Sequence, residues 1–136
     1  MRTAIDTNIL SSLWSGEPTA QGISIALNEA QGLGGLVISP AVYAELRAYP
    51  GATKEFVDEF LAKTNIVVDW ALDDAAWQLV ADRFGAYAER RRSEAGAPKR
   101  LLADFIVGAH ALLHADRLMT LDHRRYAQEF AELKVV

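Results

Sequence analysis

The sequence predicts an α/β domain with a short, mostly parallel central sheet. Short apolar runs rich in branched residues alternate with longer stretches whose apolar residues recur at helical spacing, a pattern typical of parallel strands joined by helices. Hydrophobic residues make up 51% of the 136 residues, which is enough for one core at this length. We therefore expect a single domain over residues 1–136.

Four short apolar runs are expected to form the central strands. Runs this short are common for strands that are buried on both faces of a parallel sheet. A weaker candidate lies at the end of the sequence, at Leu133–Val136. The four stronger strands are expected at Thr3–Ile5, Leu36–Ile38, Ile66–Val68 and Leu118–Thr120.

Three helices are predicted between the first three strands. Residues Pro18–Ala30 place their apolar side chains on one face, and the glycines that follow stop a helix. Ser39 is a typical N-cap and the proline after it a typical first helical residue, so a helix is expected at Pro40–Arg47. Another is expected at Thr53–Lys63.

Two longer helices are predicted in the second half of the chain. The first runs from Asp73 to about Glu94, and the second is expected at Lys99–His114, after a glycine and a proline that break the chain. The buried stripe of the first is expected to contain Trp77, Val80, Phe84 and Tyr87. The second is expected to pack Leu101, Leu102, Phe105, Ile106, Ala109, Leu112 and Leu113.

The composition excludes several classes of site. The chain has no cysteine, so a disulfide framework, a thiolate zinc site and a cysteine nucleophile are all excluded. The sequence has no apolar signal core at its start and no stretch that approaches a membrane span. We therefore expect a cytoplasmic protein without a membrane partner.

The charge of the chain is unevenly distributed. The net charge of −4 would argue against a protein that coats itself on nucleic acid. Residues 1–82, however, hold 4 Lys/Arg and 11 Asp/Glu, whereas residues 83–136 hold 10 and 7. A polyanion is therefore expected to approach the C-terminal half.

Two acidic residues follow predicted strands. Asp6 comes directly after the first strand and Asp122 after the fourth, and ligands bind at the carboxyl edge of a parallel sheet. Thr120 points the same way as Asp122 by strand alternation. For either aspartate taken alone, capping of the following helix is the better explanation.

Two further acids lie on predicted helices. Glu45 borders the buried stripe of its helix, where its stem would cover apolar surface even without a functional role. Asp104 lies inside a strongly apolar helix, one turn before Gly108, whose presence suggests that a packed neighbour or a ligand needs space there. The alternative for Asp104 is an ion pair with Arg100, four residues earlier.

Together the four acids predict a metal site. Carboxylates that share one sheet edge repel one another strongly unless a cation neutralises them. An all-oxygen set of donors suits Mg²⁺ or Mn²⁺.

These residues stand in four blocks that resemble a known family. Asp6-Thr7-Asn8 follows the opening strand, Ala44-Glu45-Leu46 lies on a helix, the block from Asp104 to Ala111 opens another, and Thr120-Leu121-Asp122 follows a strand. The chain resembles the PIN domain over nearly its whole length. More narrowly, it resembles the VapC-type toxins of toxin–antitoxin pairs.

The resemblance implies a fold, an activity and a site. The fold would be a PIN-like three-layer α/β/α sandwich, and the activity a metal-dependent endoribonuclease using Mg²⁺ or Mn²⁺ on single-stranded or looped RNA. The catalytic and metal-binding residues implied are Asp6, Glu45, Asp104 and Asp122, with Asn8 and Thr120 as auxiliary neighbours that orient a carboxylate or a water. The basic residues expected to contact RNA are Arg90, Arg91, Arg92, Lys99, Arg100, Arg124 and Arg125, although a solvated surface explains each of them equally well.

The resemblance also implies partners. VapC-type toxins form homodimers and are inhibited by a VapB-type antitoxin whose C-terminal segment lies across the acidic cleft. Leu13, Trp14 and Ile23 are candidates for part of that groove, with an ordinary core contact as the alternative.

Other functional classes are weaker explanations. A haloacid dehalogenase-type phosphatase needs a second aspartate two positions after Asp6, where this chain has Asn8. A response-regulator receiver domain needs an acidic pair at the first strand, which is also missing. A solitary RNA-processing nuclease and a non-catalytic PIN-like binding module remain the alternatives to the toxin.

Overall fold

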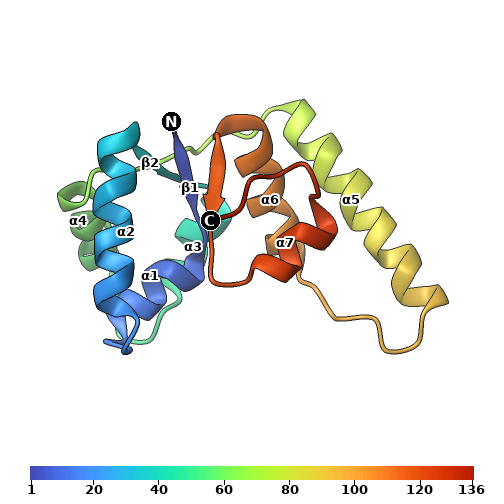
Figure 1. Cartoon of the computed structure of the whole chain (residues 1–136), viewed down its shortest axis with the longest axis horizontal. Coiled ribbons are helices and arrows are strands. Elements are labelled where there is room, and N and C mark those ends of the chain that lie inside the picture. Colours follow the sequence, from blue (N-terminus) through green and yellow to red (C-terminus); the bar gives the residue numbers. More distant parts are fainter.

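The computed structural model describes residues 1–136 as a four-stranded sheet covered by seven helices (Figure 1). Every predicted helix is present, and two short helices follow Asp6 and Asp122. In chain order the elements are β1 (Thr3–Ile5), α1 (Thr7–Trp14), α2 (Ala20–Leu33), β2 (Leu36–Ile38), α3 (Pro40–Arg47), α4 (Lys54–Lys63), β3 (Ile66–Val68), α5 (Asp74–Ser93), α6 (Leu102–His114), β4 (Arg117–Met119) and α7 (His123–Glu129).

The sheet is parallel throughout, with the strand order β3-β2-β1-β4. Figure 1 shows α1, α2 and α4 on one side of the strands and α5, α6 and α7 on the other, which confirms the three-layer α/β/α arrangement. Thr3 of β1 is paired with Leu36 of β2 and with Arg117 of β4, so the carboxyl ends of the two central strands and β4 meet at one edge.

The central strands contain few polar residues because they are buried in the core. All three residues of β1 and of β2 are buried, because helices cover both faces. Side chains from α3, α4 and α6 complete the core, including Leu46, Val57 and Phe105, which are completely buried. None of the helices combines the length and apolar character needed to cross a lipid bilayer.

Some predicted details are wrong. Leu133–Val136 is not a regular strand but forms a single parallel bridge, from Val135 to Leu118. Its backbone still hydrogen bonds along β4, with the Thr120 N–H donating to the Val136 carbonyl at 3.1 Å. The C-terminal segment therefore covers one edge of the sheet.

The apolar stripe of α6 is narrower than predicted. The helix begins three residues later than expected, so Leu101 lies outside it and Leu102 is its first residue. Four side chains expected in the core are instead exposed: Leu101, Leu102 and Leu113 near the two ends of α6, and Trp77 on α5. Gly108, by contrast, has a clear structural role, because a side chain there would overlap the buried ring of Phe130.

Candidate active site

Asp6 lies at the end of β1, where it is both a helix cap and a buried acid. One carboxylate oxygen accepts the Thr7 N–H at 2.8 Å, which caps α1, and the other accepts the Thr120 hydroxyl at 2.8 Å. Thr120 reaches Asp6 because β4 pairs directly with β1. The carboxylate is only 6% exposed, so it is held rigidly at the carboxyl edge of the sheet.

Asn8 and Thr120 connect the ends of these two strands. The Asn8 amide donates to the Thr120 hydroxyl at 3.3 Å and its carbonyl accepts the Leu121 N–H at 3.1 Å. Both predicted auxiliary residues therefore lie beside Asp6, and they position its carboxylate.

Glu45 reaches the same edge from α3. Its carboxylate accepts the Thr7 hydroxyl at 2.6 Å, and Thr7 follows Asp6 directly in the chain. The contact depends on the packing of α1 against α3. The side chain remains exposed, and its second oxygen has no hydrogen-bond donor.

Asp104 and Asp122 share one cationic partner, Arg125. The Asp104 carboxylate accepts the Leu101 N–H at 2.9 Å, in the first turn of α6, and Arg125 Nη1 at 2.8 Å. Asp122 caps α7 by accepting the Arg125 backbone N–H at 3.2 Å, and it lies 2.9 Å from Arg125 Nη2. The alternative pairing of Asp104 with Arg100 is wrong, because Arg100 is turned toward Glu129.

The acids of this edge influence one another electrostatically. Burial raises the pKa of Asp6, and the charge of Asp104 adds to this effect against the hydrogen bonds of Thr120 and Thr7. Partial desolvation also raises the pKa of Glu45, and the charges of Asp6 and Asp104 contribute. The structure therefore brings these three acids close enough to repel, and Asp122 joins them through Arg125.

The donor set fits a divalent cation in its chemistry. Asp6, Glu45, Asp104 and Asp122 offer only oxygen, which suits Mg²⁺ or Mn²⁺, and one guanidinium leaves most of their charge uncompensated. No three acidic or histidine side chains, however, stand close enough together to hold a metal ion in this arrangement. The carboxylates are thus assembled at one edge but are arranged around Arg125.

Sequence reasoning missed Tyr126. Its side chain is 1% exposed and its hydroxyl has no hydrogen-bond partner. Burial, together with the charges of Asp6 and Asp104, keeps the pKa of Tyr126 far above its ordinary value, so the hydroxyl stays protonated. A tyrosine in a short helix gives only the signal of a core aromatic, which is why the sequence could not reveal its place beside the acids.

The basic residues predicted to contact RNA have different roles in the structure. Arg90 and Arg100 form ion pairs with Glu129, at 2.5 Å and 3.5 Å, and Arg125 lies on the acids. The remaining four side chains are at the surface: Arg92 pairs with Glu89, Arg91 donates to the Ala97 carbonyl, and Lys99 and Arg124 form no ion pair.

A mostly apolar groove of about 450 Å³ adjoins the acids. Thr120 and Leu121 form one wall, and Ile23 of α2 is among the residues opposite. Of the three residues predicted to line such a groove, only Ile23 does so. Trp14 packs edge-on against Tyr49, Phe56 and Phe60, so the core alternative is correct for this residue.

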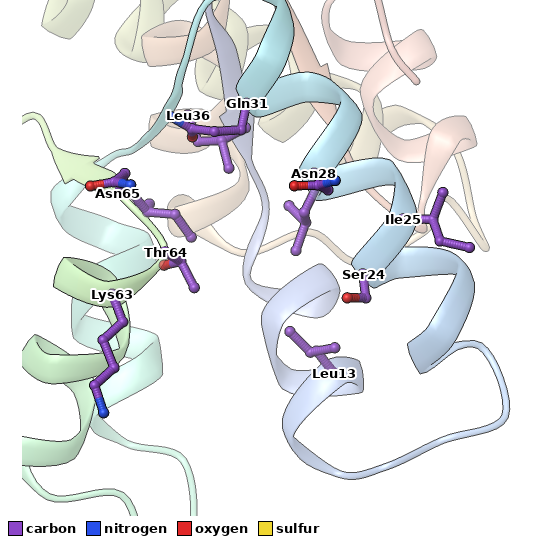
Figure 2. A pocket seen from close by; sticks show the side chains of 11 residues that line it. Leu13, Ser24, Ile25, Asn28, Gln31, Leu36, Lys63, Thr64 and Asn65 are labelled. Carbon is purple, nitrogen blue, oxygen red and sulfur yellow. The ribbon is translucent and has the colours of Figure 1, made fainter.

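A second pocket, of about 430 Å³, lies far from the acids. Figure 2 shows Leu13, Asn28 and Gln31 on one side of it and Lys63 and Thr64 on the other. Its lining includes Leu36 and Ile66, the first residues of β2 and β3, at the amino edge of the sheet. No acidic residue lines it.

Comparison with known proteins identifies the family. The chain is similar to three solved structures: VapBC-1 from nontypeable Haemophilus influenzae (20% identity, 100% of this chain and 97% of that chain covered, TM-score 0.68), VapBC2 from Rickettsia felis bound to a DNA fragment from their promoter (16%, 100% and 98%, 0.68), and FitAcB from Neisseria gonorrhoeae (20%, 98% and 95%, 0.63). These likenesses show a shared fold. No curated protein sequence matches significantly. The sequence model of the PIN domain matches residues 3–133, and the chain therefore belongs to the PIN domain family.

Proposed function

We propose that the chain is a metal-dependent endoribonuclease that hydrolyses RNA phosphodiester bonds. The observation that carries this proposal is the gathering of Asp6, Glu45 and Asp104, with Asp122 beside them, at one edge of a PIN domain. The chain has no cysteine that could act as a nucleophile, and Thr120, which Asn8 contacts, hydrogen bonds to the Asp6 carboxylate. The site is therefore suited to binding a cation and activating water.

Each residue of the site has a distinct task in this proposal. Asp6, Glu45 and Asp104 are the principal ligands of Mg²⁺ or Mn²⁺, and Asp122 binds through water or completes a second site. Thr120 and Asn8 fix the orientation of the Asp6 carboxylate through the hydrogen bonds described above. The cation, when bound, supplies activation of the attacking water and neutralisation of charge on the scissile phosphate.

The RNA is held by cations outside the acidic edge. Arg91, Arg92, Lys99 and Arg124 are exposed and come from the half of the chain with excess positive charge. Arg90 and Arg100 serve the fold instead, since both are engaged with Glu129. Single-stranded or looped RNA is the expected substrate. The scissile phosphate must come close to partly buried carboxylates, and an unpaired strand can reach them more easily than a rigid duplex.

We further propose that the protein is the toxin of a VapBC-type pair. The fold neighbours from Haemophilus influenzae and Rickettsia felis come from VapBC proteins. The apolar groove beside Thr120 and Leu121 offers a place for apolar side chains of an antitoxin segment next to the acids. An inhibitor bound there would lie against Thr120, whose hydroxyl holds the Asp6 carboxylate.

An RNA cleavage assay tests the nuclease directly. Purified wild type should cleave single-stranded RNA in Mg²⁺ or Mn²⁺ and lose this activity in excess chelator. Asp104→Asn should reduce cleavage by about 100-fold or more, because it removes a metal ligand. Asp82→Asn is the matched control, since Asp82 is an exposed aspartate on α5, away from the acids. Cleavage by Asp104→Asn at the wild-type rate would refute the proposed site.

A growth assay tests the toxin. Expression of the chain alone should arrest bacterial growth, and Asp104→Asn should relieve the arrest at the same protein level. Growth arrest that persists in the variant would show that the nuclease is not its cause, and cleavage in vitro without any arrest would favour a solitary RNA-processing enzyme.

A further inference from the structure

Arg125 is the only cationic side chain in contact with the acidic quartet. Its Nη1 lies 2.8 Å from Asp104 Oδ1 and its Nη2 lies 2.9 Å from Asp122 Oδ2. The two carboxylates come from different elements, since Asp104 is in the first turn of α6 and Asp122 caps α7. One guanidinium therefore connects two of the four acids.

The position of Arg125 is central to the whole edge. Its charge also reaches Glu45, where it opposes the desolvation and the like charges that raise the pKa of that carboxyl. The negative charge of Asp6, in turn, helps to raise the pKa of Arg125. With its side chain only 31% exposed, the guanidinium interacts with these acids in a partly desolvated space, where Coulomb interactions are strong.

The contacts of Asp104 place a cation at one of its two carboxylate oxygens. Its Oδ2 accepts the Leu101 N–H and its Oδ1 accepts Arg125 Nη1, so a metal ion bound at Oδ1 would stand within a few ångströms of the guanidinium. Like charges at that separation repel strongly. In the structure, which contains this ion pair, no three of the acids converge on one point.

We infer that Arg125 is an internal counter-cation that competes with the divalent metal for Asp104 and Asp122, and that its guanidinium leaves these carboxylates when the metal binds. The inference rests on the proposed metal-dependent function. Its consequence is a metal affinity that is weaker than the four carboxylates alone would provide, and a metal-free protein whose acidic edge is already partly neutralised.

The bound position of Arg125 does not satisfy all of its hydrogen-bond donors. The Arg125 Nε–H is buried without a hydrogen-bond acceptor, so the bound position leaves one donor unsatisfied. The Arg125 side chain is itself 31% exposed, so solvent already reaches part of it. The guanidinium therefore needs only side-chain rotation to reach water.

Calorimetric titration of Mn²⁺ into the full-length protein tests the competition. Arg125→Gln should bind Mn²⁺ about tenfold more tightly than wild type or better, because close charge pairs couple by at least that much. Arg124→Gln is the matched control: it removes the same charge from the adjacent residue and should change the affinity by less than about threefold. Arg125→Lys keeps the charge without the two-pronged contact and should lie between wild type and Arg125→Gln.

The outcomes separate this inference from the proposed function. Equal Mn²⁺ affinity in wild type and Arg125→Gln would refute the competition between Arg125 and the metal, but it would remain consistent with the proposed metal site. No Mn²⁺ binding by any of the variants overturns both. A tenfold gain in Arg124→Gln as well would show a general charge effect and would also overturn the inference.

A measurement on the wild-type protein covers the case in which Arg125→Gln does not fold. In a ¹H–¹⁵N spectrum of the arginine Nε–H groups, addition of Mg²⁺ should shift the Arg125 signal, which is assigned by its absence in Arg125→Lys. The Arg90 signal should stay in place, since Glu129 holds that side chain away from the acids. An unmoved Arg125 signal at saturating Mg²⁺ overturns the inference.

Discussion

Gly108 lies inside α6, with the ring of Phe130 against its α-carbon. Phe130 is 1% exposed and follows α7 directly, so the glycine lets the end of α7 approach α6 closely. A glycine inside an apolar helix had predicted that a packed neighbour or a ligand lies close to the helix at this position. The structure shows that the neighbour is an aromatic side chain and not a ligand of Asp104.

Replacing this glycine should therefore be costly. We expect Gly108→Ala to lower the free energy of unfolding by about 1–3 kcal/mol, because the new methyl group forces the buried ring to move. Gly85→Ala in α5 is the control: nothing lies within 4 Å of the added carbon, and the change should stabilise the protein by about 0.5–1 kcal/mol. Urea denaturation measures both, and equal effects of the two substitutions would contradict the packing argument.

His110 is the other residue whose burial has a measurable consequence. The ring is 1% exposed and lies 3.1 Å from an Asp69 carboxylate oxygen, with His114 and Arg2 also facing it. Burial lowers the pKa of His110 below 6.5, although Asp69 partly opposes this shift. The folded protein therefore holds this histidine neutral at a pH where the unfolded chain binds a proton.

This difference in proton binding makes stability fall in acid. As the pH drops below about 6.5, only the unfolded chain gains a proton at this position, so the free energy of unfolding decreases by up to about 1.4 kcal/mol per pH unit. His110→Gln should lose less stability than wild type between pH 7 and pH 5. Urea denaturation at both values tests this expectation, and identical losses in the two proteins would show that His110 does not contribute.

At the scale of elements, α7 is short and is anchored at both ends by charges. Asp122 caps its start, and Glu129, with its side chain 3% exposed, forms ion pairs with Arg90 and Arg100 at its end. Arg83 adds a hydrogen bond to the Glu129 carbonyl at 3.0 Å. The arginines of α5 and of the following loop therefore hold the helix that carries Arg125 and Tyr126.

Breaking this anchor should destabilise the fold more than breaking a surface pair. Arg90→Gln should lower the free energy of unfolding by about 1–3 kcal/mol, because it leaves a buried carboxylate with one fewer partner. Arg92→Gln removes the same charge from a pair in which both side chains are exposed, and should stay within about 0.5 kcal/mol of wild type. Denaturation curves of the two variants decide between a structural and a purely surface role for Arg90.

At the scale of the whole molecule, one apolar surface lacks an intramolecular partner. Trp70 and Trp77 are 61% and 48% exposed, and together with Leu72 and Ile106 they line a shallow, almost wholly apolar hollow. Contiguous exposed apolar surface of this kind marks interaction sites. We propose a second copy of the chain as the occupant, which would be the homodimer that the family resemblance implies.

A charge placed in this surface should abolish the proposed homodimer. Trp77→Glu is expected to convert a dimer into a monomer at micromolar concentration, as measured by size-exclusion chromatography with light scattering. Ile25→Glu, at a similarly exposed position on α2, should leave the mass unchanged. A dimer that survives Trp77→Glu would place the interface elsewhere.

Much of this architecture was predictable because its determinants are local. The runs at β1, β2 and β3 have the predicted bounds, and Ser39 caps α3 as its sequence indicated. The position of Asp6 directly after β1 follows from the same periodicity. Trp77 and Leu113 were wrongly expected in the core, because helical spacing shows which residues share a face of a helix. It does not show whether another element packs over that face, which only the tertiary structure reveals.

The sequence by itself determined the parallel α/β fold and the set of acids at one edge of it, because strand periodicity, helix caps and motif order depend on neighbouring residues alone. Only the tertiary structure decided that Arg125 spans Asp104 and Asp122, that Glu129 engages Arg90 and Arg100, and that Tyr126 is buried beside the acids. These contacts join residues whose distances are set by how α5, α6 and α7 pack, and no local pattern encodes that packing.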